Sequence, residues 1–121
     1  MQHRRSLGQE GERLAAEHLA RAGYRIVGRN VRADRVEIDL IATRPGLVVF
    51  VEVKTRSSHG FGLPEEAVDT AKRRRLVRGA RAWLRAHGRP GLRARFDVVA
   101  VERADGQLTL RHLPAAFDAT P

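Results

Sequence analysis

Two strand-like segments with charged residues inside them constrain the fold of this chain more than any other feature. Residues 36–43 (VEIDLIAT) and 47–55 (LVVFVEVKT) are rich in β-branched and aliphatic residues, and the Arg-Pro-Gly sequence at 44–46 favours a turn between them. The pattern therefore predicts a β-hairpin. Asp39, Glu52 and Lys54 fall within its strands, where charged residues are depleted and are rarely buried unless paired or bound to metal.

The alternation of a strand predicts how these charges are arranged. Because successive side chains point to opposite faces, Glu52 and Lys54 share one face, and Glu37 and Asp39 also point the same way. The opposite face of the second strand is apolar and consists of Leu47, Val49, Val51 and Val53. The two carboxylates and the ammonium at the centre of the hairpin therefore need an explanation.

Metal-assisted cleavage of phosphodiesters would use such a set of residues. Mg²⁺ is held by one or two carboxylates together with water and substrate phosphate, so Asp39 and Glu52 are candidate ligands, with the carbonyl of Val53 as a third oxygen. Mn²⁺ would substitute for Mg²⁺. The ion would polarise a phosphoryl oxygen and activate water, and Lys54 would hold or help deprotonate that water or neutralise charge at phosphorus. The alternative is an exposed hairpin face whose Glu–Lys ion pair has no chemical role.

Lysine usage is a second indication of a special role for Lys54. The chain has 23 basic residues of the Lys and Arg types, and Lys54 and Lys72 are the only lysines among them. A chain that uses arginine for nearly every positive charge can retain lysine where a planar, permanently charged guanidinium would not serve. Chance is the other explanation for two positions.

Composition limits the class of protein and its partners. The 121 residues are enough for one domain, 1–121, with a real core. A formal charge of +9 favours a polyanionic partner such as nucleic acid. The absence of cysteine excludes disulfides and thiolate zinc sites. The N-terminus lacks the apolar segment of a signal peptide, and no run is apolar enough to span a membrane, so we expect a cytoplasmic protein.

The remaining pattern predicts the order α-β-β-β-α-β-β. Helical spacing of apolar residues covers 7–22 and 70–87, with Thr70 as the expected cap of the second helix. A strand is expected before the hairpin, at 24–31, and two strands after the second helix, at 93–102 and 107–112. Asp97 is expected to be a structural partner of an arginine, and Phe117 to dock a tail that begins at Pro114. Residues 56–63, which include His59, are expected to form a loop.

Two helical residues are candidates for the same site. Glu12 lies at the edge of the apolar stripe of the first helix, where it could reach the sheet; its other role is favourable charge near a helix N-terminus. Lys72 lies at the margin of the stripe of the second helix, where it would contact phosphate or only cover the core with its stem. The second helix also carries Arg73 and five further arginines.

With these motifs, the chain resembles the YraN-like family of small bacterial proteins. The resemblance rests on the hairpin string, on residues 7–12 before it and on Arg95-Phe96-Asp97-Val98-Val99 after it, and it covers about residues 7–117. It implies a restriction-endonuclease-like fold, similar to archaeal Holliday-junction resolvases. It also implies that Asp39, Glu52 and Lys54 are the nuclease residues, with Glu12 as the additional acidic residue. Val36 stands where the family usually has glycine.

We therefore expect an α/β domain with a mixed sheet flanked by helices that cleaves DNA, with Mg²⁺ as cofactor. Branched or otherwise structured DNA is the expected substrate, and a two-fold dimer would suit a four-way junction. Lys72, Arg56 and Arg73 are the residues assigned to nucleic-acid binding. The alternative is a basic nucleic-acid-binding module with a weak or silent nuclease site, and a third is an interaction protein with a purely structural hairpin.

Overall fold

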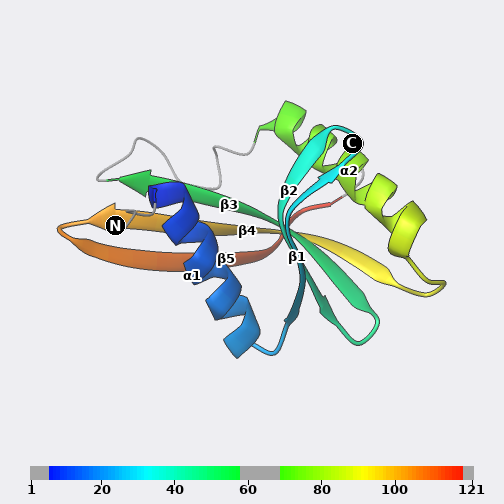
Figure 1. The fold of residues 1–121 in the computed structure, drawn as a ribbon, viewed down its shortest axis with the longest axis horizontal. Coiled ribbons are helices and arrows are strands. Elements are labelled where there is room, and N and C mark those ends of the chain that lie inside the picture. Colours follow the sequence, from blue (N-terminus) through cyan, green and yellow to red (C-terminus); the bar gives the residue numbers. More distant parts are fainter. Residues whose placement is uncertain (1–5, 58–68, 119–121) are drawn as a thin grey trace, which may run out of the picture.

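The computed structural model describes residues 6–57 and 69–118, which form helices and strands in the predicted order α-β-β-β-α-β-β (Figure 1). The elements are α1 Leu7–Arg21, β1 Arg25–Ala33, β2 Val36–Arg44, β3 Leu47–Ser57, α2 Thr70–His87, β4 Arg93–Ala104 and β5 Gln107–Phe117. The expected fold class, a mixed sheet flanked by helices, is confirmed. Neither helix of the described ranges is long and apolar enough to cross a membrane.

The five strands form one sheet in chain order, β1-β2-β3-β4-β5. All neighbouring strands are antiparallel except β3 and β4, which run parallel from Leu47 opposite Arg93 to Ser57 opposite Arg103. A parallel pair needs a crossover connection, and the segment that contains α2 provides it. The strand that carries Glu52 and Lys54 is therefore the central strand of the sheet.

The two helices cover opposite faces of the sheet, and each face has its own core. Residues of α1 pack in a cluster of Ala15, Ala16, Leu19, Tyr24, Leu40, Ala42, Val49, Val51, Val99 and Val101. Residues of α2 pack in a cluster of Val36, Ile38, Ile41, Val48, Phe50, Leu76, Val77, Ala80 and Phe96. Leu47 and Val53 lie against the first cluster, so the predicted apolar face of β3 is confirmed.

Both helices begin at a side-chain cap. In α1, the Ser6 hydroxyl accepts a hydrogen bond from the backbone of Gln9 at 3.1 Å, and the Gln9 side chain accepts one from the backbone of Ser6 at 3.0 Å. In α2 the cap is Asp69, whose carboxylate accepts from the Lys72 backbone at 2.9 Å. The prediction of Thr70 as cap is wrong by one residue. The Asp69 carboxylate accepts the hydrogen bond from the unpaired backbone N–H of Lys72, and Thr70 is the first helical residue.

Every strand ends later than the sequence predicted, and the extensions of β5 and β3 change a specific expectation. β5 continues through Pro114 to Phe117, because it is an edge strand and a missing N–H there can face away from the ladder. Phe117 stacks on Phe96 with ring centroids 5.2 Å apart, so the expected docking is confirmed within a strand. β3 includes Arg56 and Ser57, so the loop predicted for 56–63 is wrong at its first two residues. The rest of that loop prediction, with His59, lies outside the described residues.

Asp97 is a buried ionic centre that ties β4 and β5 to each other and, through Arg95, to Tyr24 just before β1. It is fully buried and accepts two hydrogen bonds from Arg95, both at 2.8 Å, while His112 Nε2 lies 2.7 Å from Oδ2. Arg95 also donates to the Tyr24 hydroxyl at 2.6 Å. Burial raises the pKa of Asp97, but the hydrogen bonds from His112, Arg95 and the Ala115 backbone outweigh it and lower the pKa overall. The predicted structural role of Asp97 is confirmed.

The sheet splits between β2 and β3 at the centre of the molecule. Their pairing runs from Arg44 opposite Leu47 to Leu40 opposite Val51 and goes no further. Beyond that point β1 and β2 turn away from the other three strands, as Figure 1 shows. Ile38 packs on the α2 side and Leu40 on the α1 side, so the alternation of β2 changes phase at Asp39. Asn30, which lies opposite Asp39 in the β1–β2 pair, has a positive φ of 49°, so the extended backbone of β1 is irregular at the same level.

Candidate active site at the strand split

Glu52 lies on β3 just beyond the last β2–β3 pair, with two lysines around one of its oxygens. Its Oε1 is 3.3 Å from the Nζ of Lys54 on the same strand and 3.3 Å from the Nζ of Lys72 on α2. The Glu52 and Lys54 side chains are only 15% and 17% exposed, so these charges are partly withdrawn from water. The structure thus joins the two lysines of the chain at one carboxylate.

Asp39 is held where β2 leaves β3. Its Oδ2 accepts a hydrogen bond from the backbone N–H of Val53 at 2.8 Å, which replaces the ladder bond that a paired strand would make. In a strand, the N–H and C=O of one residue point to the same edge, so the Val53 carbonyl also points to the Asp39 side of β3. The two predicted carboxylate ligands and the predicted carbonyl are thereby placed around the end of the β2–β3 pairing.

The environment of Asp39 opposes its negative charge. Burial, followed by the neighbouring carboxylate of Glu52, raises the pKa of Asp39 from 3.8 to about 7, although the hydrogen bond from Val53 lowers it. Glu12 and Glu37 add smaller contributions of the same sign as Glu52. A carboxylate that is costly to ionise among other carboxylates is a group that a cation would stabilise.

Glu12, on α1, is linked to Glu37 by the side-chain amide of Asn30. In the orientation that satisfies both of its polar atoms, the Asn30 side chain donates to Glu37 Oε1 at 3.1 Å and to Glu12 Oε1 at 3.2 Å. Glu12 lines a hollow of about 310 Å³ beside Asn30 and does not line the cleft that contains Asp39 and Glu52. Glu12 is therefore close enough to contribute to the raised pKa of Asp39, but it lies outside the cleft that contains Asp39 and Glu52.

Asp39 and Glu52 open into a cleft of about 240 Å³, which we call the carboxylate cleft. It is lined by Arg35, Val36, Glu37, Asp39, Glu52, Lys72, Arg75 and Leu76. Lys72, Arg75 and Leu76 come from one side of α2, because they are three and four residues apart. The cleft therefore combines carboxylates from the sheet with cations from a helix and from the β1–β2 turn, as a site for a phosphate and a metal ion would require.

The donor set of the cleft is suited to magnesium and less so to metals with many protein ligands. Within residues 6–57 and 69–118, no group of three or more His, Cys, Asp or Glu side chains is placed to hold a metal ion. Mg²⁺ needs fewer, since it keeps several waters and binds through one or two carboxylates and substrate phosphate. Asp39, Glu52 and the Val53 carbonyl fit that requirement, and the raised pKa of Asp39 supports a cation there.

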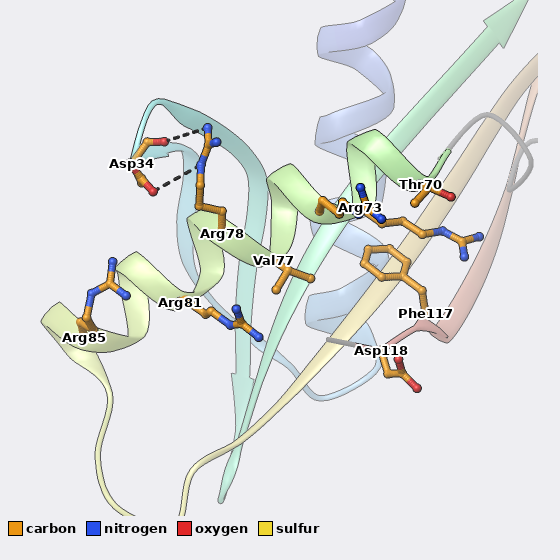
Figure 2. A pocket seen from close by; sticks show the side chains of 10 residues that line it. Asp34, Thr70, Arg73, Val77, Arg78, Arg81, Arg85, Phe117 and Asp118 are labelled. Carbon is orange, nitrogen blue, oxygen red and sulfur yellow. Dashed lines mark hydrogen bonds and ion pairs between the residues drawn. The ribbon is translucent and has the colours of Figure 1, made fainter. Parts of the chain in front are cut away.

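Two of the residues assigned to nucleic-acid binding lie elsewhere. Arg73 does not line the carboxylate cleft, and its guanidinium lies 5.3 Å from the ring centroid of Phe117 in a separate, larger pocket (Figure 2). Arg56 lies half-buried near the end of β3 and is also absent from the cleft lining. Of the three predicted contacts, the structure places only Lys72 at the carboxylates.

Sequence reasoning missed four residues around the site, namely Asn30, Arg35, Glu37 and Arg75. A signal existed for two of them. Glu37 is two residues from Asp39, so both point to the same face of a strand. Arg75 is three residues after Lys72, so both lie on one side of a helix. Asn30 and Arg35 depend on the β1–β2 pairing and its turn, for which the sequence carried no comparable pattern.

Comparison with known proteins assigns the chain to a family. The profile described as "Uncharacterised protein family UPF0102" matches residues 11–101, which include Glu12, the hairpin and α2. The chain is similar to a UPF0102 protein of Symbiobacterium thermophilum, with 51% identity over 116 residues that cover 95% of this chain and 98% of that protein. A UPF0102 protein of Anaeromyxobacter dehalogenans is 49% identical over 115 residues, 95% of this chain and 86% of that protein. A UPF0102 protein of Nitratidesulfovibrio vulgaris is 45% identical over 117 residues, 97% and 87% of the two chains. The chain therefore belongs to the UPF0102 family, the YraN-like family that its motifs resemble.

Proposed function

We propose that this protein is a metal-dependent endonuclease that hydrolyses phosphodiester bonds in DNA. The observation that carries the proposal is the arrangement at the strand split. There the Asp39 carboxylate accepts the Val53 N–H in place of a backbone carbonyl of β2, and the neighbouring Glu52 forms ion pairs with two lysines. A carboxylate with a raised pKa beside a second carboxylate, in a cleft lined by cations, is typical of phosphoryl-transfer sites. The formal charge of +9 supports a polyanionic substrate such as nucleic acid.

Each side chain has a role that follows from its position. Asp39, Glu52 and the Val53 carbonyl would hold Mg²⁺ or Mn²⁺, which supplies polarisation of a phosphoryl oxygen when bound. Lys54 is close enough to the carboxylates to orient the attacking water or to offset the charge that develops at phosphorus. Lys72 and Arg75, from the facing side of α2, would position the phosphate. Glu12 and Asn30 would keep Glu37 and Asp39 in place from behind.

A cleavage assay with Mg²⁺ or Mn²⁺ tests the proposal. The substrates are linear, single-stranded, flapped and four-way-junction DNA, since branched DNA is the expected target and a two-fold dimer would suit symmetric cuts in a junction. Glu52→Gln and Asp39→Asn should abolish cleavage. Glu102→Gln and Asp105→Asn are matched controls, because they make the same chemical change outside the carboxylate cleft. Equal activity in all four variants would refute the assignment. We propose that the protein cleaves DNA in the cytoplasm.

A binding module with a silent nuclease site is the second candidate. It is favoured by the two ammonium groups at Glu52 Oε1, which balance that carboxylate without any metal. This candidate predicts that DNA binds with a salt-dependent affinity and is not cut on any of the four substrates. It also predicts that Mg²⁺ does not raise the melting temperature, whereas a ligand of the folded state does so by mass action.

A further inference from the structure

A row of arginines runs along α2 on the side away from the carboxylate cleft. Arg74, Arg78, Arg81 and Arg85 follow at intervals of three and four residues, so they share one side of the helix. At 1.5 Å per residue the row is about 16 Å long. These residues line a groove of about 790 Å³, whose other walls include Val77 and Phe117 (Figure 2). We call it the arginine groove.

Five arginines and two carboxylates, those of Asp34 and Asp118, line this groove. Arg78 pairs with Asp34, with 3.3 Å between Nε and Oδ2, and Figure 2 shows it turned toward that residue. Within the described part of the chain, Arg74, Arg81 and Arg85 make no ion pair with a carboxylate. Like charges three and four residues apart on a helix repel each other, so the row weakens the isolated helix. A polyanion in the groove would relieve that repulsion.

The walls of the groove are apolar and aromatic as well as charged. Val77 is only 8% exposed and belongs to the core beneath the helix. Phe117 is supported by Phe96, with which it stacks, and the Arg73 guanidinium lies 5.3 Å from its ring centroid. Proteins that bind single-stranded nucleic acid combine these two elements, a basic groove along the backbone and aromatic rings on which bases stack. An acidic peptide would use the charges but would bring no base to the aromatic ring.

The groove and the carboxylate cleft share no lining residue. At 100° per residue, Arg74, Arg78 and Arg81 lie on the opposite side of α2 from Lys72, Arg75 and Leu76. One helix therefore presents a cationic side to the proposed catalytic residues and a different cationic side to the groove. A nucleic acid in the groove would be bound by residues that take no part in the proposed cleavage.

We propose that the arginine groove binds a single strand of nucleic acid. The phosphates lie along Arg74, Arg81 and Arg85, and a base stacks in contact with Phe117 and Arg73. A duplex would present phosphates on its whole outer surface and would leave Phe117 without a base. The further consequence, selection of DNA with a single-stranded arm, rests on the proposed function, whereas binding in the groove does not.

Fluorescence anisotropy with a labelled thymidine oligonucleotide of about 12 nucleotides tests the binding. The measurements use the full chain in EDTA, and a duplex of the same length is the second probe. The triple variant R74Q/R81Q/R85Q should weaken oligonucleotide binding by about 10-fold or more. Its salt dependence should also be shallower, by about 2 in the slope of log affinity against log salt. The triple variant R21Q/R89Q/R103Q removes the same charge from exposed positions that do not line the groove. It should change the affinity by less than about threefold.

Phe117→Leu tests the aromatic contact while keeping an apolar side chain against Phe96. It should lower the affinity for the oligonucleotide by about fivefold or more, the scale of one lost base stack, and leave duplex affinity unchanged. Equal losses in the two triple variants would overturn the groove, because the effect would then be general charge. Tighter binding of the duplex, or equal competition by a polyglutamate peptide, would overturn the assignment to a single strand. Asp39→Asn should bind the oligonucleotide as wild type does, so loss of cleavage and loss of groove binding are separable.

Discussion

Replacing Asp39 with asparagine should stabilise the metal-free protein, and the gain should grow as the pH rises. Burial and neighbouring carboxylates raise the pKa of Asp39 from 3.8 to about 7, so the folded state prefers this group protonated. A group whose pKa is raised on folding stabilises the protein fully below its unfolded pKa, and that contribution is lost as the pH passes the folded value. Asparagine keeps an oxygen that can accept the Val53 hydrogen bond and carries no charge.

The size of the effect follows from the same values. A tenfold change in proton affinity is worth about 1.4 kcal/mol, so a rise from 3.8 to about 7 corresponds to at most about 4 kcal/mol. The difference in unfolding free energy between Asp39→Asn and wild type should be small at about pH 4. It should increase through about pH 7 and level off above it.

Urea unfolding in EDTA at a series of pH values measures this difference. Asp105→Asn is the matched control, since it is a turn residue outside the carboxylate cleft with a positive φ that asparagine tolerates. Added Mg²⁺ should then stabilise the wild type above about pH 7 and leave Asp39→Asn unchanged. Parallel stability curves for Asp39→Asn and wild type would show that folding does not raise the pKa of Asp39, and a variant less stable at high pH would show that the Asp39 charge is favourable in the fold.

Three other substitutions probe the site, the ionic centre and the helix–sheet contact. Lys54→Arg should slow cleavage by about 100-fold with little change in DNA affinity, because a guanidinium keeps the charge but cannot accept a proton. Cleavage rate and fluorescence anisotropy, both measured on one DNA substrate, test this. Asp97→Asn should cost about 3–5 kcal/mol in urea unfolding, because it breaks a buried pair. Gly11→Ala should cost about 1–3 kcal/mol, because the new Cβ would lie 2.1 Å from Thr55 Cγ2, and Thr55→Ser in the same chain should recover part of the loss.

These predictions have distinct contradicting outcomes. Normal cleavage by Lys54→Arg would reduce that residue to a phosphate contact. A loss below about 1 kcal/mol in Asp97→Asn would mean that the buried network tolerates a neutral partner. No recovery on adding Thr55→Ser to Gly11→Ala would show that the contact with Thr55 Cγ2 is not the source of the loss.

Most of the fold could be predicted because the strands and helices have clear periods. Alternation in β3 separated Glu52 and Lys54 from the apolar valines, and the structure preserves that separation. Errors came where tertiary pairing decides the outcome. β5 extends past Pro114 because β4 offers it a partner, and Asp69 caps α2 because its carboxylate is the nearer acceptor. Local propensity does not contain either fact.

The site was predictable in its members more than in its arrangement. Asp39, Glu52 and Lys54 were identified from residue type, and Lys72 from its place on a helix margin. The change of phase at Asp39 was not, because it requires a left-handed Asn30 in the neighbouring strand. Arg73 was predicted to bind nucleic acid, and the structure places it in the pocket with Phe117, apart from the carboxylate cleft.

The central position of β3 implies an order of assembly. Its pairing with β2 closes across a short turn, whereas its parallel pairing joins Leu47 to Arg93 and cannot form until the segment with α2 has folded back. Local hairpins form faster than distant parallel pairs, since less chain entropy is lost in closing them. A folding chain should therefore bring Asp39 and Glu52 together early and receive Lys72 late. The carboxylates of the cleft would exist for a time without Lys72 and Arg75 of α2, and divalent metal present during refolding would speed the early step.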